Sequence, residues 1–156
     1  MESLKHIMIV DASYDRMQRV TGIGIIIREV QNPKKRRGKV IDEILESYFG
    51  MPRGSGEKFA ILRALEIASE RGYQIVKVRS DYNPMRKKLK KDHEKNLGHE
   101  RDGVHATILR LAKTFAEVKF AYQARRKNQN AHRLARRAVA EMVLQLRTDS
   151  SLKESC

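Results

Sequence analysis

The sequence predicts an α/β fold in which helices pack against one mixed β-sheet. Two observations support this prediction. Three strand-like runs, at 6–11, 20–30 and 40–48, are joined by short connections, which is typical of an antiparallel meander. A strand, helix and strand pattern then extends to residue 80, which predicts a crossover that returns to the same sheet.

The first two strands differ in their pattern. Residues 7–10, IMIV, are all apolar, as expected of a strand buried on both faces, and the run ends at Asp11. The second strand, 20–30, is β-branched and aliphatic. Within it, Gly22 and Gly24 predict either a bulge or the close approach of another backbone.

The third strand and the first long helix follow. A cation-rich turn at 31–39 leads into the strand at 40–48, whose alternation is imperfect. After a loop, Ser55 is the predicted N-cap of a helix that stops at Gly72. The apolar positions of this helix form one stripe: 60, 61, 64, 65 and 68.

The second half of the chain alternates strands and helices. The polar, basic stretch 84–103 predicts a short helix followed by a loop. The other predicted elements are a strand at 73–80, an amphipathic helix at 104–116, a strand at 117–123 and a final helix at 128–146.

The length of the chain predicts one domain. A chain of 156 residues can enclose one hydrophobic core but is too short for two, and 40% hydrophobic residues is ordinary for a folded protein. We therefore expect a single domain over 1–147 and a flexible tail at 148–156.

The charge of the chain predicts a polyanionic partner. There are 33 Lys and Arg against 19 Asp and Glu, which leaves +14 at pH 7. Nucleic acid is the first expectation and an anionic membrane the second, while a merely solvated basic surface is the alternative. Two runs concentrate the cations, KKRR at 34–37 and RKKLKK at 86–91.

Cysteine usage and hydropathy predict the compartment. The single cysteine, Cys156, excludes an internal disulfide and suits a reducing compartment. No apolar run approaches the roughly 20 residues of a membrane span, and residues 1–6 lack the apolar core of a signal peptide. We therefore expect a cytoplasmic protein with no membrane partner. The oligomeric state is left open, with a monomer favoured.

Three acidic residues lie where solvated carboxylates are seldom found. Asp11 ends the first strand and Asp81 closes the fourth. Glu57 begins the first long helix and shares its apolar stripe, because steps of three and four residues lead from it to that stripe. In a sheet with helical crossovers these sites can converge at one edge, where ligand crevices often form.

Converging carboxylates repel one another, and a divalent metal ion is the simplest way to neutralise them. A small set of hard oxygen ligands suits Mg²⁺. Each residue also has an ordinary alternative role. Asp11 can be a turn residue, Glu57 can interact with the helix dipole, and Asp81 can cap the following helix.

Five segments in order resemble the ribonuclease H family, in particular the reverse-transcriptase-related branch. The resemblance spans about residues 6–138, and the segments are IVDAS at 9–13, GIGIIIRE at 22–29, GEKFAILRALEIA at 56–68, VRSDYNPM at 78–85 and RRKNQNAHRLARRA at 125–138. The last segment is similar to the family signature Asn-x-x-Ala-Asp-x-Leu-Ala, with His132 in the position of the Asp.

The resemblance implies a ribonuclease H-like fold, with a five-stranded mixed sheet of order 3-2-1-4-5 and helices on both faces. It also implies hydrolysis of the RNA strand of an RNA–DNA hybrid at a two-metal site holding Mg²⁺ or Mn²⁺. The catalytic and metal-binding residues would be Asp11, Glu57, Asp81 and His132.

The sequence departs from the family pattern in four places. Ala12 follows Asp11 where the family usually has Gly, and Gly54 stands where many members carry Asn. The loop QARRKNQ at 123–129 lacks the assisting His of some members. His132 replaces the last carboxylate. A neutral imidazole suits Mn²⁺ better than Mg²⁺, but His132 also borders an apolar helical stripe, so a packed histidine is the alternative. The remaining histidines are expected at the surface: His6, His93, His99 and His105.

The basic runs and two family-like segments supply the predicted contacts to the hybrid, which is read mainly through its backbone shape and 2′-hydroxyl groups. The predicted nucleic-acid-binding residues are Lys34, Lys35, Arg36, Arg37, Asn83, Arg86, Lys87, Lys88, Lys90, Lys91, Arg125 and Asn128. For each basic run, a solvated and solubilising face is the alternative.

Two other functions remain open. The first is a nucleic-acid-binding module with the same fold and a weak or inactive site. The second is another nuclease of the same superfamily, either a proofreading-type exonuclease or a junction resolvase. Such exonucleases carry an Asp-x-Glu pair on the first strand, which the segment DAS at 11–13 lacks.

Overall fold

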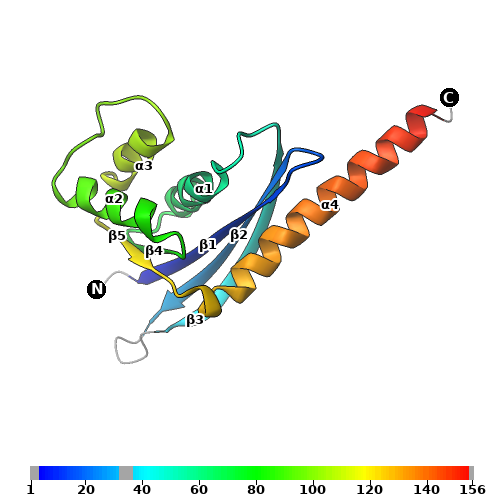
Figure 1. The fold of residues 1–156 in the computed structure, drawn as a ribbon. Helices are drawn as coiled ribbons and strands as arrows, with labels where there is room; N and C mark the ends of the chain where they lie inside the picture. The colour runs from blue at the N-terminus through cyan, green and yellow to red at the C-terminus, as the bar shows by residue number, and fades with distance from the viewer. Residues whose placement is uncertain (1–3, 32–36, 155–156) are drawn as a thin grey trace.

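The computed structural model describes residues 4–31 and 37–154, with side chains over 4–31 and 37–149 (Figure 1). Its sheet has the order β3-β2-β1-β4-β5. The pairs β1–β2 and β2–β3 are antiparallel, and β1–β4 and β4–β5 are parallel. The predicted mixed sheet and its strand order are therefore confirmed. The strands are β1 Lys5–Asp15, β2 Val20–Val30, β3 Lys39–Phe49, β4 Ile75–Ser80 and β5 Glu117–Tyr122.

Helices cover both faces of this sheet, as predicted (Figure 1). Three of them, α1, α2 and α3, pack on one face, while α4 crosses the other face over β1, β2 and β3. None of the described helices is long and apolar enough to cross a membrane. The helical elements are α1 Gly56–Glu70, α2 Asn83–Glu94, α3 Val104–Ala112, the 3₁₀ turn η1 Arg125–Lys127 and α4 Gln129–Glu154.

Two hydrophobic clusters lie on the two faces of the sheet. The larger cluster, between the sheet and α1–α3, includes Met8 and Val10 of β1. The smaller cluster, beneath α4, includes Ile7 and Ile9 of the same strand. Because successive side chains of a strand point to opposite faces, one apolar run supplies both clusters. The prediction of a strand buried on both faces is confirmed.

Several predicted boundaries were wrong by a few residues. β1 extends beyond Asp11 because its pairing with β2 continues to Asp15. The helix predicted at 104–116 ends at Ala112. The last helix extends to Glu154 instead of residue 146, so most of the predicted flexible tail at 148–156 is helical. Residues 129–154 contain no Gly or Pro, so nothing in the local sequence stops the helix.

The C-terminal end of α1 has the predicted glycine stop, whereas the side-chain bond at its N-cap differs from the predicted one. Ser55 occupies the N-cap position, but its hydroxyl donates to the carbonyl of Pro52 at 2.6 Å instead of accepting from the helix. Gly72 has a φ of +74°, a left-handed conformation that favours glycine, and Tyr73 N–H donates back to the Ala68 carbonyl at 2.9 Å. The predicted stop at Gly72 is confirmed.

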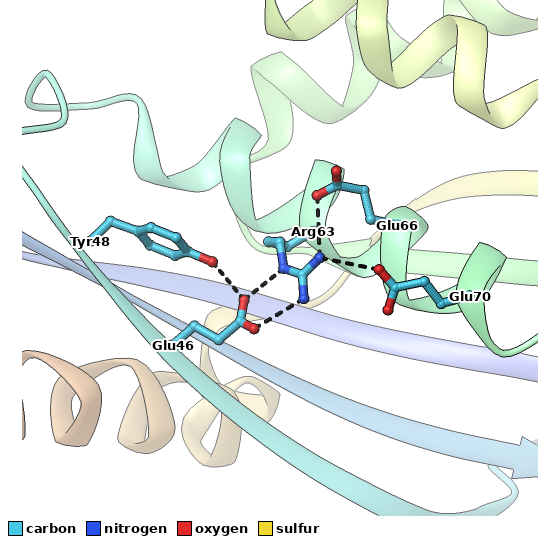
Figure 2. A network of polar contacts seen from close by, with 5 residues as sticks. All are labelled: Glu46, Tyr48, Arg63, Glu66 and Glu70. Carbon is cyan, nitrogen blue, oxygen red and sulfur yellow. Dashed lines mark hydrogen bonds and ion pairs between the residues drawn. The ribbon is translucent and has the colours of Figure 1, made fainter.

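An ion pair ties α1 to β3 (Figure 2). Arg63 donates to the Glu46 carboxylate through Nε at 2.7 Å and through Nη2 at 3.1 Å. Tyr48 also donates its hydroxyl to this carboxylate, at 2.7 Å, while Glu66 and Glu70 contact the same guanidinium. The arginine holds the pKa of Glu46 below its usual range. This is the bidentate geometry in which arginine binds carboxylates most strongly.

The expectation that His6 lies at the surface was wrong. Its side chain is buried, its ring stacks on Tyr73 with centroids 3.5 Å apart, and its Nε2 lies 3.1 Å from Glu29 Oε2. His105 is also half-buried and bonded to Asp92, at 2.9 Å. These partners are distant in sequence, so local patterns could not indicate them.

The two glycines of β2 mark a close approach between α4 and the sheet. A Cβ atom on Gly24 would overlap the carbonyl oxygen of Ala131 and lie 2.8 Å from Ala135 N, and one on Gly22 would overlap the carbonyl of Ala135. The one irregularity of the β2–β3 register is elsewhere, between residues 27 and 28. Of the two predicted alternatives, close backbone approach is therefore confirmed.

We predict that Gly24→Ala destabilises the protein, because the added methyl must push the backbone of α4 away from β2. Overpacking of this kind costs about 1–3 kcal/mol, and urea unfolding would measure the loss. Glu43→Ala, an exposed change in β3, is the control and should stay within about 0.5 kcal/mol of the wild type. Equal stability of Gly24→Ala and the wild type would contradict the close approach.

Candidate metal centre

The three acidic residues singled out in the sequence lie together. Asp11, Glu57 and Asp81 each offer a carboxylate oxygen, and these oxygens all lie within 4.8 Å of one another. Asp11 is buried, whereas the other two are half-buried. The residues come from β1, the first turn of α1 and the end of β4.

The parallel pairing of β1 and β4 explains why Asp11 and Asp81 meet. The last paired residues are Ile9 and Arg79. Asp11 lies two residues further along β1, and Asp81 lies two residues after Arg79, just beyond the end of β4. The sequence suggested that Asp11 ends the first strand, but β1 continues beyond it to Asp15. Asp11 lies where β4 has ended and where only β2 still pairs with β1, opposite Gly24.

The N-terminus of α1 packs directly on β1 and β2. A Cβ on Gly56 would lie 3.0 Å from both the Ala12 Cβ and the Thr21 Cγ2. A glycine in the helix thus makes room for the methyl group of Ala12, the residue that departs from the Asp-Gly pattern. Because the helix comes so close, the next residue, Glu57, is brought to Asp11.

The electrostatics of the cluster disfavour three negative charges. Burial and the charges of Asp11 and Asp81 raise the pKa of Glu57 to about 8. Burial and Asp81 also raise the pKa of Asp11, against hydrogen bonds from the Ala12 amide and His132 that lower it. The buried Oε2 of Glu57 has no hydrogen-bond partner among the described residues. An oxygen-only, carboxylate-rich set with an unpartnered oxygen fits a hard divalent cation.

His132 joins the cluster from the first turns of α4. Its Nδ1 lies 2.7 Å from Asp11 Oδ2, and 47% of its side chain is exposed. The ring is therefore not buried in the core, and its role as a metal ligand stays a prediction. Nε2 of the ring has no hydrogen-bond partner among residues 4–31 and 37–149.

Asn128, placed in the sequence among the nucleic-acid contacts, is almost fully buried. Its Nδ2 donates to the Val10 carbonyl at 3.3 Å, while its Oδ1 is buried without a partner in the described chain. His132 N–H in turn donates to the Asn128 carbonyl at 3.0 Å. Asn128 therefore joins the start of α4 to β1, one residue before Asp11.

These residues line a cleft of about 630 Å³. The cleft is also lined by Tyr82, Tyr122 and Arg136, which were not predicted as site residues from the sequence. Each had an available signal. Tyr82 follows Asp81, Tyr122 ends the strand beside β4, and Arg136 lies four residues after His132 on one helical face. Arg125, predicted from the sequence, lines the cleft as well.

The other predicted nucleic-acid-binding residues lie on α2 and near the turn before β3. Lys87, Lys88, Lys90 and Lys91 are on α2, and half-buried Arg86 is hydrogen-bonded to the side chain of Asn83. Arg86 and Lys90 line a separate hollow of about 460 Å³ against β5. Arg37 is exposed. Lys34, Lys35 and Arg36 lie outside the described residues.

Comparisons with known proteins match this geometry to one fold. A family model described as reverse transcriptase-like matches residues 9–138. RNase H1 of the halophilic archaeon Halobacterium salinarum is 16% identical, with 88% of this chain and 98% of that chain covered and a TM-score of 0.69. The N-terminal RNase H domain of a Mycobacterium tuberculosis protein is 15% identical, with 92% and 99% covered and a TM-score of 0.70.

A third similar structure is LC11-RNase H1, isolated from compost by a metagenomic approach and solved in complex with an RNA/DNA hybrid. It is 19% identical, with 88% of this chain and 99% of that chain covered and a TM-score of 0.66. A search of curated protein sequences gives no significant match. At these identities, the structural likeness establishes a shared fold.

We predict that Glu57→Gln stabilises the metal-free protein in alkali. Between the ordinary glutamate pKa of 4.5 and about 8, folded Glu57 keeps a proton that the unfolded chain releases. Stability is therefore lost as the pH rises through this window. In chelator at pH 9, the variant should be more stable by at least about 1 kcal/mol, because its amide has no charge to be desolvated or to be repelled by Asp11 and Asp81.

This difference should shrink towards pH 4.5, where wild-type Glu57 is largely protonated in the folded state and half protonated in the unfolded one. Urea unfolding across the pH range measures it, and Glu43→Gln, at an exposed position, is the matched control. Parallel pH profiles for Glu57→Gln and the wild type would contradict the electrostatic account of the cluster.

Proposed function

The chain belongs to the reverse transcriptase-like family, and from that premise we propose that it is a metal-dependent ribonuclease H. It would act as an endonuclease on the RNA strand of RNA–DNA hybrids. The observation that carries the proposal is the cluster of three carboxylates in a cleft at the sheet edge, one of them with a buried oxygen that nothing in the described chain satisfies.

The residues that would hold the metal are Asp11, Glu57 and Asp81, with His132 as a fourth and variable ligand. Their number and type suit two ions of Mg²⁺ or Mn²⁺. When bound, such ions supply Lewis-acid stabilisation of charge on the phosphate and lower the pKa of water.

The protein itself orients the site before any ion binds. The buried Asp11 is fixed by its hydrogen bond to His132 Nδ1 and by the amide of Ala12. Because Nδ1 makes this bond, Nε2 of the half-exposed His132 ring is the nitrogen that could ligate a metal ion. Glu57, whose pKa is raised to about 8, would lose its proton when a cation replaces it.

Besides the carboxylates, the cleft carries groups suited to a phosphate backbone. Arg125 and Arg136 line it, together with Tyr82 and Tyr122. Arginine binds phosphate oxygens through paired donors, and the aromatic rings can pack against sugars or bases. The lysines of α2 would add non-specific contacts, so we expect binding to weaken with salt.

The choice of an RNA–DNA hybrid rests on two supports. One is the family resemblance in the sequence. The other is a similar structure solved with an RNA/DNA hybrid. A charge of +14 adds a general preference for polyanions. The alternative is a binding module of the same fold that does not cleave, and a cleavage assay on a labelled hybrid distinguishes the two.

We predict that Asp11→Asn abolishes cleavage of a labelled hybrid, because it removes a charged ligand from the centre of the cluster. The cleavage rate should fall by more than about 100-fold, since mutation of a residue that only supports a metal ligand already costs about 10–100-fold. Binding of the hybrid should persist. Asp102→Asn, an exposed change with the same difference in charge, is the control. A wild type that binds the hybrid but does not cleave it with Mg²⁺ or Mn²⁺ would favour the binding module.

We predict that His132→Asp shifts the metal preference of cleavage from Mn²⁺ towards Mg²⁺, since carboxylate is the harder ligand. His132→Ala should cost less activity than Asp11→Asn, because three carboxylates remain. Rates measured at matched concentrations of each metal test both expectations. An unmoved preference and full activity in both variants would remove His132 from the metal site.

A further inference from the structure

One part of the sheet is left uncovered by helices and is strongly basic. α4 packs on β1, β2 and β3, and the other helices lie on the opposite face (Figure 1). On β4, Val76 and Val78 are buried towards those helices, whereas Lys77 and Arg79 alternate with them and so point to the face of α4. The register places Arg79 beside Ile9.

A hollow of about 570 Å³ lies here, separate from the carboxylate cleft. Its floor includes Ile9 and Ile26, and its polar lining includes the amides of Gln123 and Asn130. Four cations reach it, and none of the described residues that line it is acidic. The cations are Arg28, Arg37, Arg79 and Lys127.

None of these four cations forms an ion pair with a carboxylate in the described part of the chain. Arg79 is half-buried and donates Nη1 only to the amide oxygen of Gln123, at 3.4 Å. Burial and the neighbouring charge of Arg28 lower the pKa of Arg79. Two like charges are thus held together in partly desolvated positions, which is unfavourable unless an anion joins them.

Three other arginines of the described chain are paired with carboxylates. Arg63 is clamped by Glu46 (Figure 2), Arg71 by Asp42, and Arg137 by Glu141. The fold therefore supplies a carboxylate where Arg63 and Arg71 tie two elements together. At Arg28 and Arg79, which share one hollow, the described chain supplies none, so an anion from outside the chain could join them.

We propose that this hollow is a phosphate-binding site, in which Arg28, Arg79 and Lys127 hold the phosphate oxygens. Two guanidinium groups present paired donors that match the oxygens of a phosphate. The amide of Gln123 is already oriented, because its Nε2 donates to the Lys127 carbonyl at 3.0 Å and its Oε1 accepts from Arg79.

The phosphate can come from a polynucleotide or from a free phosphate compound. Tyr122, which is 49% exposed, lines both this hollow and the carboxylate cleft, so the two are neighbours. A strand that leaves the cleft past Tyr122 would bring its next phosphates to the cations. This assignment to a polynucleotide rests on the proposed function, whereas phosphate binding does not.

The first experiment measures binding of pyrophosphate by calorimetry, in chelator and without nucleic acid. The wild type should bind, and the double variant Arg28→Gln/Arg79→Gln should bind at least about five-fold more weakly. Arg133→Gln/Arg147→Gln, two arginines of α4 with the same change in charge, is the control and should match the wild type. Equal affinity in all three proteins, or no binding to the wild type, would overturn the proposal.

Thermal unfolding without anion separates a binding role from a structural one. Because Arg28→Gln/Arg79→Gln removes the repulsion between two like charges, this variant should be at least as stable as the wild type. A marked loss of stability would mean that these arginines support the fold, and would overturn the proposal. Arg79→Lys keeps the charge but loses the paired donors, so we expect an affinity between those of the wild type and the double variant.

The last arm identifies the source of the phosphate, in the Asp11→Asn background to prevent cleavage. If a polynucleotide supplies it, the double variant should weaken binding of a long hybrid and leave a short one unaffected. The slope of log affinity against log salt should then become shallower by about 1–2, roughly one unit for each phosphate that the variant no longer neutralises. An unchanged slope together with a loss of pyrophosphate affinity would assign the site to a free phosphate compound. Failure of the wild type to cleave hybrids would overturn the nuclease and leave the pyrophosphate result intact.

Discussion

The close contact between the backbone of α4 and strand β2 positions the helix that carries His132 to the carboxylate cluster. It exists because Gly22 and Gly24 have no side chains where the carbonyls of α4 approach. Gly24 is also the residue that pairs with Asp11 across the sheet. The glycine that admits the helix therefore lies beside the buried carboxylate, and the first turns of α4 carry His132 to that carboxylate at 2.7 Å.

A second close contact completes the cluster from the other face of the sheet. Gly56 allows the N-terminus of α1 to pack on Ala12, which brings Glu57 to Asp11. The end of the β1–β4 pairing leaves Asp81 beside them. Backbone contacts thus force three carboxylates together in a partly desolvated place, where burial and mutual repulsion raise the pKa of Asp11 and of Glu57. A bound cation would remove that cost.

The same placement of α4 sets the distribution of the positive charges. Because the helix covers β1, β2 and β3, the outer face of β4 stays open, and Arg79 lies there without a carboxylate partner in the described chain. On the opposite face, Arg63 has its glutamate partner (Figure 2). A net charge of +14 alone indicates a polyanionic partner, but only the pairing of individual cations distinguishes those that hold the fold from those available to a ligand.

The mixed sheet, its crossover and the three acidic residues could be predicted from the sequence, because alternation, helical spacing and strand ends are local properties. The sequence left open whether Gly22 and Gly24 marked a bulge or a close approach. The packing of α4 on β2 answers that question, and the fold also sets the burial of His6 and the half-exposed position of His132 beside Asp11. The physical reason is that each of these depends on a partner distant along the chain, whose position is set by packing between elements and is absent from any local pattern.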